Sequence, residues 1–231
     1  MPPIYKVAVI QLYSKPLDVA DNFSRAAEYI RSAAAQGAVL AVLPEYHLTG
    51  WEPDRPGFMD ACQLWENYLA RYRQMAKALK ICIVPGTLVE PRKDEATGEL
   101  ALFNVAYFID DQGGILGSYI KKNIWYQTCW TSSYLTDNPR HSERAHLSSG
   151  RQRHEAIDTP IGKVGMLICW DIAFPEAFRE LITQGAKIII VPCFWGLTDC
   201  SEEGLRYNPG SAALVMDSTL TTRAFENTCG R

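Results

Sequence analysis

Three reactive side chains stand at the ends of apolar, strand-like segments of this sequence: Glu45, Lys121 and Cys169. The segments that precede them are Ala38–Leu43, Gly114–Ile120 and Lys163–Ile168. In a mostly parallel sheet, ligands meet the carboxyl ends of the strands, so these groups could share one site. A thiol accompanied by a carboxylate and an ammonium is a set suited to nucleophilic catalysis.

Cys169 has the flanking sequence of a reactive thiol, although most buried cysteines are inert. It opens a tight strand-to-helix passage, Trp170–Glu176, with Pro175 near the expected helix start. A helix N-terminus stabilises a nearby thiolate, and its backbone N–H groups could hold an oxyanion. The other cysteines lack such flanks or a clear partner and are interpreted as structural: Cys62, Cys82, Cys129, Cys193, Cys200 and Cys229.

Glu45 and Lys121 are weaker signals when each is taken alone. Glu45 could be an exposed loop carboxylate, but the aromatic and glycine-containing stretch Tyr46–Trp51 that follows is typical of a pocket wall. Lysines usually lie on the surface. Strand alternation, however, places Lys121 on the same face as Tyr119 and turns Lys122 the other way. The three groups together favour a site more than any of them does singly.

The elements around these residues predict a single α/β domain over residues 1–231. Strands are expected at Tyr5–Leu12, Ala38–Leu43, Ile81–Val84, Leu102–Asp110, Gly114–Lys121, His154–Asp158, Lys163–Cys169 and Ala186–Val191. Helices are expected at Asp18–Gln36, Ala61–Leu79, Glu176–Gln184 and Gly210–Asn227. The strand–helix–strand order at the start implies parallel strands with a helix packed on one face.

Composition and charge exclude several classes of partner. Apolar residues make up 47% and charged residues 21%, and the net charge of −3 comes with 23 scattered basic residues. No basic stripe indicates nucleic acid, and no apolar run is long enough to span a membrane. The seven cysteines form no CxxC pair, and the four histidines are not at ligand spacing, so we expect reduced thiols, a cytoplasmic location and no metal.

Three segments of the chain match one known family in order and spacing. They are Leu43–Tyr46 with Thr49–Trp51, Gly117–Trp125, and Gly165–Asp171 with Phe174–Glu176 and Arg179. In these segments the chain resembles the nitrilase-like carbon–nitrogen hydrolase superfamily. The resemblance implies a four-layer α-β-β-α sandwich, often dimerised through a helical face, and a Glu–Lys–Cys triad without cofactor. It also implies that a second glutamate, Glu143, assists the triad.

The same resemblance implies a mechanism and a substrate class. Glu45 would take the proton of Cys169, the thiolate would attack an amide or nitrile carbon, and Lys121 with the Trp170 N–H would stabilise the negative charge. Asp171 stands where true nitrilases usually carry glutamate, which favours amide or carbamoyl substrates. The pocket for this small molecule is expected to involve Trp51, Trp170, Phe194 and Trp195, although such aromatic residues are often core residues.

Two departures from the family pattern keep other hypotheses open. Residues 126–142 are an apparent insertion, and the chain ends soon after Arg223–Cys229, so we expect the C-terminal strands of the family to be missing. An inactive homologue that serves as a binding or assembly module is therefore an alternative. A cysteine protease is disfavoured, because no histidine occupies a comparable strand-end position.

Overall fold

The computed structural model of the chain describes residues 4–94, 97–125, 142–197 and 202–227. The first elements are β1 (Val7–Val9), α1 (Val19–Ala35), β2 (Leu40–Val42), α2 (Phe58–Gln63), α3 (Trp65–Leu79), β3 (Cys82–Val84), β4 (Leu88–Lys93), β5 (Leu100–Ile109) and β6 (Ile115–Ile120). They are followed by the short 3₁₀ helix η2 (Glu143–Ala145), β7 (Ile157–Thr159), β8 (Gly162–Met166), the 3₁₀ helix η3 (Cys169–Ala173), α4 (Pro175–Thr183), β9 (Ile188–Ile190), α5 (Glu202–Tyr207) and α6 (Ser211–Glu226). The predicted helices at 18–36, 176–184 and 210–227 and the predicted hairpin β5–β6 are confirmed.

The first sheet has the strand order β1-β2-β3-β5-β4, and β6 also pairs with β5. Strands β1, β2 and β3 are parallel, as the strand–helix–strand opening predicts. Alternate residues face different cores: Ala41 and Ile83 pack against α1 and α3, whereas Leu40 and Val84 pack toward the second sheet. Burial of both faces explains why these strands are continuous apolar runs in the sequence.

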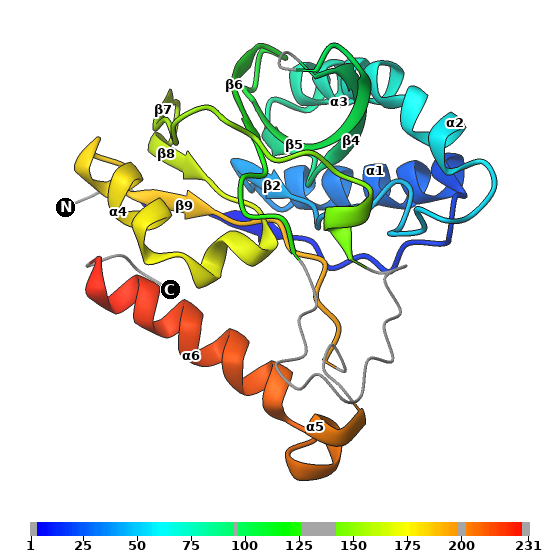
Figure 1. Cartoon of the computed structure of the whole chain (residues 1–231). Helices are drawn as coiled ribbons and strands as arrows, with labels where there is room; N and C mark the ends of the chain where they lie inside the picture. Colours follow the sequence, from blue (N-terminus) through cyan, green and yellow to red (C-terminus); the bar gives the residue numbers. More distant parts are fainter. Residues whose placement is uncertain (1–3, 95–96, 126–141, 198–201, 228–231) are drawn as a thin grey trace.

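The second sheet has the order β7-β8-β9, with β8 and β9 parallel. One buried cluster joins Phe108 of the first sheet to Val164 and Met166 of the second, and it extends to Phe178 and Leu181 of α4. Helices α1 and α3 cover the outer face of the first sheet, and α4 and α6 lie outside the second (Figure 1). The described residues therefore form the expected α-β-β-α sandwich.

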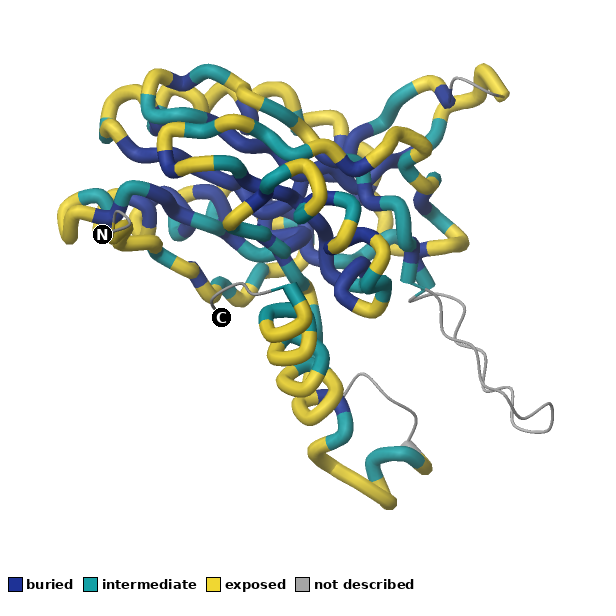
Figure 2. The backbone as a smooth tube through the Cα atoms, turned by 90° about the vertical axis from the view of Figure 1, so that its left-hand side faces the viewer, coloured by how far each residue is buried: buried dark blue, intermediate teal, exposed yellow. Residues whose placement is uncertain are grey.

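The distribution of burial follows these layers. Buried positions run through the centre of the molecule, while the C-terminal helix carries mostly exposed and half-buried residues (Figure 2). Its exposed apolar side chains include Leu214, Val215 and Phe225. Among the described residues, no helix is both long enough and apolar enough to cross a bilayer.

The predicted helix over Ala61–Leu79 is wrong in one respect, because the chain forms two helices that meet at Leu64. Phe58 of α2 packs in a small cluster with Tyr46, whereas Tyr72 of α3 packs in the main core against α1. The two helices pack in different hydrophobic clusters, and the helix is interrupted between them. The exposed Leu64 lies at this break.

Strand β4 was not predicted from the sequence, because Pro91 and its charged neighbours are typical of a loop. The strand lies at the edge of the first sheet, where proline is tolerated. Its Glu90 is fully buried and accepts hydrogen bonds from Arg92 and from the Tyr107 hydroxyl, the latter at 2.7 Å. A paired carboxylate thus replaces the apolar residue that a strand pattern would require.

Several predictions lie outside the described residues. The expected insertion over 126–142 is one of them except for its last residue, and Cys129, Cys200 and Cys229 are others. The cysteines that the structure describes, Cys62, Cys82, Cys169 and Cys193, are free thiols. The homodimer and the cytoplasmic location stay predictions.

Candidate active site

A buried ammonium lies between two buried carboxylates at one end of the first sheet. The Lys121 Nζ atom is 2.8 Å from Glu45 Oε1 and 2.6 Å from Glu143 Oε1. All three side chains are at most 4% exposed. Lys121 follows β6, and its backbone N–H extends that strand by donating to the Asn104 carbonyl at 2.9 Å. The structure therefore brings together three of the residues that the sequence singled out.

The carboxylate of Glu45 is fixed through both of its oxygens. Oε1 also accepts a hydrogen bond of 2.8 Å from the Asn104 amide, and Oε2 accepts one of 2.8 Å from the backbone N–H of Phe194. Glu45 follows β2, and the β3–β4 connection lies tightly against it. A Cβ at Gly86, whose φ is +58°, would lie 1.8 Å from the Pro44 carbonyl oxygen. Only glycine allows this close approach.

Glu143, in η2, links the ammonium to the loop that follows Glu45. Its Oε1 accepts a short hydrogen bond from the Tyr46 hydroxyl, and its Oε2 accepts one of 2.7 Å from the Trp125 backbone N–H. The Tyr46 hydroxyl in turn accepts from the Asn104 amide at 2.8 Å. These bonds satisfy the carboxylate although it is buried, which a buried charge requires.

Cys169 lies beside this group of charges, at the point where the chain leaves β8. The strand ends at Met166, earlier than the sequence predicted, and Cys169 is the first residue of η3. Its φ is +44°, a left-handed backbone conformation that is uncommon for a non-glycine residue. The residue is 6% exposed, and its thiol donates to the Phe194 carbonyl at 3.7 Å, while the N–H of the same Phe194 donates to Glu45 at 2.8 Å. The four predicted catalytic residues thus converge.

Asp171, in η3, holds the turn that presents Cys169. Its Oδ2 accepts hydrogen bonds from the Ile168 N–H at 2.9 Å and from the Tyr119 hydroxyl at 2.8 Å. Its Oδ1 accepts from the backbone and side-chain nitrogens of Asn123, at 3.1 and 2.8 Å. One fully buried carboxylate therefore connects the nucleophile turn to the strand and loop on either side of the lysine.

The proton affinities of the site follow from burial and from the neighbouring charges. Burial raises the pKa of Glu45, and the Lys121 charge only partly offsets this effect. Burial disfavours the Lys121 ammonium, but Glu45, Cys169 and Glu143 outweigh it and raise the pKa of that lysine. A hydrogen bond with Cys193, then burial and the Glu45 charge, raise the pKa of Cys169 well above its usual range, against the opposing charge of Lys121. Removal of the proton from this thiol therefore calls for a neighbouring base.

A model of the family described as carbon-nitrogen hydrolase matches residues 6–229, which is most of the chain. This chain belongs to that family. The match confirms the predicted nitrilase-like superfamily and agrees with the sandwich described above. In this family member Glu45 and Lys121 follow strands β2 and β6, whereas Cys169 lies in η3, three residues beyond the end of β8.

Relatives of known name support the amidase-type branch. Deaminated glutathione amidase of Bos taurus is 30% identical over 82% of this chain and 56% of its own length. N-carbamoylputrescine amidase of Arabidopsis thaliana is 28% identical over 81% of this chain and 58% of its own. The carbon–nitrogen hydrolase chain described here thus spans little more than half the length of these relatives.

A solved structure gives the same fold. A variant of the amidase from Nesterenkonia sp. AN1 carries the acetamide moiety of fluoroacetamide added covalently at its active-site cysteine. The comparison has a TM-score of 0.73 at 23% identity and covers 97% of this chain and 73% of that one. The likeness supports the nitrilase-type sandwich of this hydrolase-family member.

Aromatic side chains of the predicted pocket flank the charged residues. Tyr46 stacks on Trp51 with ring centres 4.8 Å apart and meets Phe194 edge-on at 6.0 Å. Trp170 and Trp195 form a second pair with centres 5.9 Å apart. The first group adjoins Glu143 through Tyr46, and Trp170 of the second pair directly follows Cys169 in the sequence. Their contact with substrate stays a prediction.

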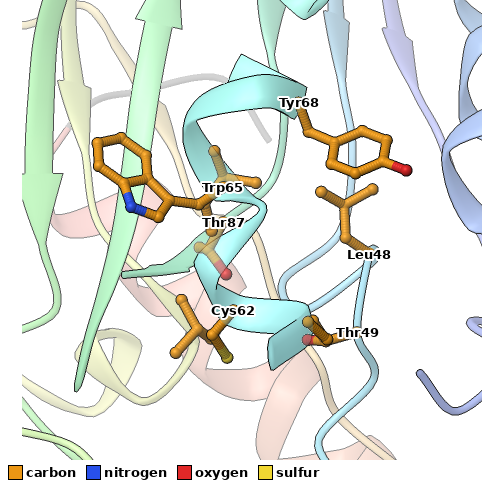
Figure 3. A pocket seen from close by; sticks show the side chains of 9 residues that line it. Leu48, Thr49, Cys62, Trp65, Tyr68 and Thr87 are labelled. Carbon is orange, nitrogen blue, oxygen red and sulfur yellow. The ribbon is translucent and has the colours of Figure 1, made fainter. Parts of the chain in front are cut away.

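Two hollows in the molecule lie apart from this chemistry. One, of about 10 Å³, is lined by residues that include Leu48, Cys62, Trp65 and Thr87, and it has room for about one water (Figure 3). The other, of about 400 Å³, lies between the loop that precedes α2 and the start of β5. Neither is lined by the triad, so we assign the substrate to neither of them.

Sequence reasoning missed Asn104 and the hydrogen-bonding role of the Tyr46 hydroxyl. Asn104 is the one amide among the apolar and aromatic residues of β5, Leu100–Ile109, and an amide in the buried part of that strand requires partners. This exception to the apolar pattern could have identified Asn104 as a residue with buried hydrogen-bond partners. The hydroxyl of Tyr46 had none, because its partners come from distant segments.

Proposed function

We propose that this chain hydrolyses a non-peptide carbon–nitrogen bond in a small amide or carbamoyl compound, through a thioester on Cys169. The observation that carries the proposal is the buried Lys121 ammonium, which contacts Glu45 and Glu143 beside the thiol. A buried cation costs free energy unless it is paired, and a cation held next to a nucleophile is suited to stabilise developing negative charge. The amidase names of the relatives agree with this reaction.

The first half-reaction forms the thioester. Glu45 removes the thiol proton of Cys169 as the sulfur attacks the carbonyl carbon, and the oxyanion of the tetrahedral intermediate is stabilised by Lys121 and the Trp170 N–H. Collapse of the intermediate breaks the carbon–nitrogen bond, and Glu45 returns the proton to the leaving ammonia or amine. The raised pKa of Glu45 makes it a stronger base than an exposed carboxylate.

The second half-reaction releases the acid. Glu45 removes a proton from water, which attacks the thioester carbon, and the carbon–sulfur bond then breaks. The proton passes to the sulfur, so the thiol is restored and a carboxylic or carbamic acid leaves. Glu143 keeps Lys121 in place and balances its charge throughout, which is a positioning role.

The substrate class rests on the residues that follow the nucleophile. Asp171 is occupied by four hydrogen bonds within the fold and is not available to a substrate. Aromatic rings around Tyr46 and Phe194 favour a compound with a flat or apolar part next to the scissile bond. We therefore expect amides and carbamoyl compounds to react faster than nitriles.

The test measures ammonia released from a panel of small amides, carbamoyl compounds and nitriles. Cys169→Ala removes only the sulfur, and alanine can adopt the backbone conformation of this position as readily as cysteine. The variant should therefore stay folded, and its activity should fall about 10³-fold or more. Cys62→Ala, at a buried cysteine outside the site, is the matched control and should stay active. Equal activity in the Cys169 variant would refute the mechanism.

The alternative is an inactive homologue that binds or assembles. It is favoured if the folded chain releases ammonia from no member of the panel and iodoacetamide does not alkylate Cys169 faster than the other cysteines. Light scattering on the same sample tests the expected homodimer.

A further inference from the structure

Cys193 lies opposite Cys169, on the segment that follows β9. The parallel register of β8 and β9 aligns Met166 with Ile190. Beyond the strand ends this register continues, because the Cys169 N–H donates to the Pro192 carbonyl at 2.9 Å. In a parallel ladder, a residue donates to the carbonyl that precedes its partner, so the partner of Cys169 is Cys193.

The two thiols are close enough to react with each other. Both residues lie just beyond their strands, and the hydrogen bond of 2.9 Å from the Cys169 N–H to the Pro192 carbonyl keeps the two segments paired there. Paired strands are about 4.8 Å apart, which falls within the Cα separation of about 4.4–6.8 Å that disulfides adopt. Both side chains belong to the cluster around the second sheet. The Cys169 thiol donates to the Phe194 carbonyl at 3.7 Å and the Cys193 thiol to the Val191 carbonyl at 3.4 Å, so both sulfurs lie along the same short segment that follows β9. Cys193 is half-buried, whereas Cys169 is buried. The mechanism above uses only one of these sulfurs.

We propose that Cys193 is a resolving thiol, which forms a disulfide with Cys169 when a peroxide oxidises the site. The Cys169 sulfur attacks one peroxide oxygen, the O–O bond breaks, and the products are a sulfenic acid on Cys169 and water. The Cys193 sulfur then attacks the Cys169 sulfur. The S–O bond breaks, the hydroxyl leaves as water with the Cys193 proton, and an S–S bond joins the two residues.

This modification has two consequences for the site. It removes the nucleophile, so hydrolysis stops until a thiol reductant restores it, and it diverts the sulfenic acid before irreversible oxidation to the sulfinic acid. Because its neighbours raise the pKa of Cys169, Glu45 would serve as the base for the peroxide reaction as in the proposed hydrolysis. The inhibition rests on the proposed function, but the disulfide itself does not.

The experiment treats the reduced chain with hydrogen peroxide and reads two signals. Peptide mapping by mass spectrometry without reduction should find the Cys169 peptide linked to the Cys193 peptide. Ammonia release should fall in parallel, and dithiothreitol should reverse both changes. If the linked peptides form although the reduced chain releases no ammonia, the thiol pair stands and the proposed hydrolysis fails.

Two variants make the test specific. Cys193→Ser should give no linked peptide, and its treated Cys169 should gain oxygen atoms and lose activity that dithiothreitol does not restore. Cys62→Ala should respond as the unaltered chain does. The proposal is overturned if Cys169 pairs with any other cysteine, or if the unaltered chain and Cys193→Ser are oxidised alike.

Discussion

Replacing Lys121 with methionine tests the charge arrangement directly. In the unaltered chain the ammonium contacts two carboxylate oxygens at 2.8 and 2.6 Å, all of them buried. The substitution leaves the carboxylates of Glu45 and Glu143 buried without their cation, while the side-chain volume changes little. Removing one partner of a buried ion pair costs about 3–5 kcal/mol, because the remaining charge is uncompensated. We expect the free energy of unfolding to fall by about that amount at neutral pH.

The loss should depend on pH in a definite direction. Without the cation, the folded-state pKa of Glu45 rises further above its unfolded value of about 4.3, because the Lys121 charge no longer opposes the effect of burial. A carboxyl with a raised folded-state pKa destabilises the fold increasingly as pH rises above the unfolded pKa. The difference in unfolding free energy between Lys121→Met and the unaltered chain should therefore grow from about pH 4 toward neutrality and shrink in acid.

Urea unfolding at several pH values, followed by circular dichroism, provides the measurement. Lys122→Met is the matched control, because Lys122 is the neighbouring lysine and is only half-buried, so its effect should stay within about 0.5 kcal/mol. The double variant Lys121→Met/Glu143→Gln removes one of the two charges and should recover part of the stability but no activity. A pH-independent loss, or an equal loss in Lys122→Met, would refute the electrostatic reasoning.

Further predictions concern the residues that position the site. Gly86→Ala should lower activity and stability, because its Cβ would lie 1.8 Å from the backbone oxygen of the residue before Glu45. Gly98→Ala is the control: its φ is also positive but the space around it is open, so it should cost only about 1 kcal/mol of stability. Ammonia release and urea unfolding measure both variants. Asp171→Asn places an amide where each oxygen accepts two hydrogen bonds, so urea unfolding should report a loss of about 1–3 kcal/mol. The acid limb of kcat/KM should lie above about pH 4.3, since the base form of Glu45 is required and its pKa is raised; a limb at or below that value would contradict the assignment.

The parts of the fold that depend on apolar pattern were predictable from the sequence. Strand β2 is an uninterrupted apolar run because both of its faces are buried. Helix α1 carries apolar residues at helical spacing because one stripe of its surface packs on the sheet. The break at Leu64 and the strand around Pro91 were not, because each depends on which core the flanking residues join. Local propensity carries no information of that kind.

Part of the candidate site was likewise predictable from the sequence, and part of it was not. Glu45, Lys121 and Cys169 were recognisable because a reactive group directly follows an apolar strand in each case. Their convergence with Asn104 could not be derived from spacing, since the hydrogen bond from that amide to Glu45 joins residues 59 positions apart. The left-handed conformation of Cys169 likewise has no signature in its neighbours.

The bond between the Phe194 backbone N–H and Glu45 bears on how new specificities could arise in this scaffold. The main chain donates this bond, so any residue except proline at position 194 can keep it, while Phe194 is 48% exposed and its ring meets Tyr46 edge-on. If the proposed function holds, selection can exchange that ring for smaller or polar groups and change substrate preference without disturbing the orientation of the Glu45 carboxylate. At this single residue, the side chain can change with the ligand while the backbone continues to position Glu45.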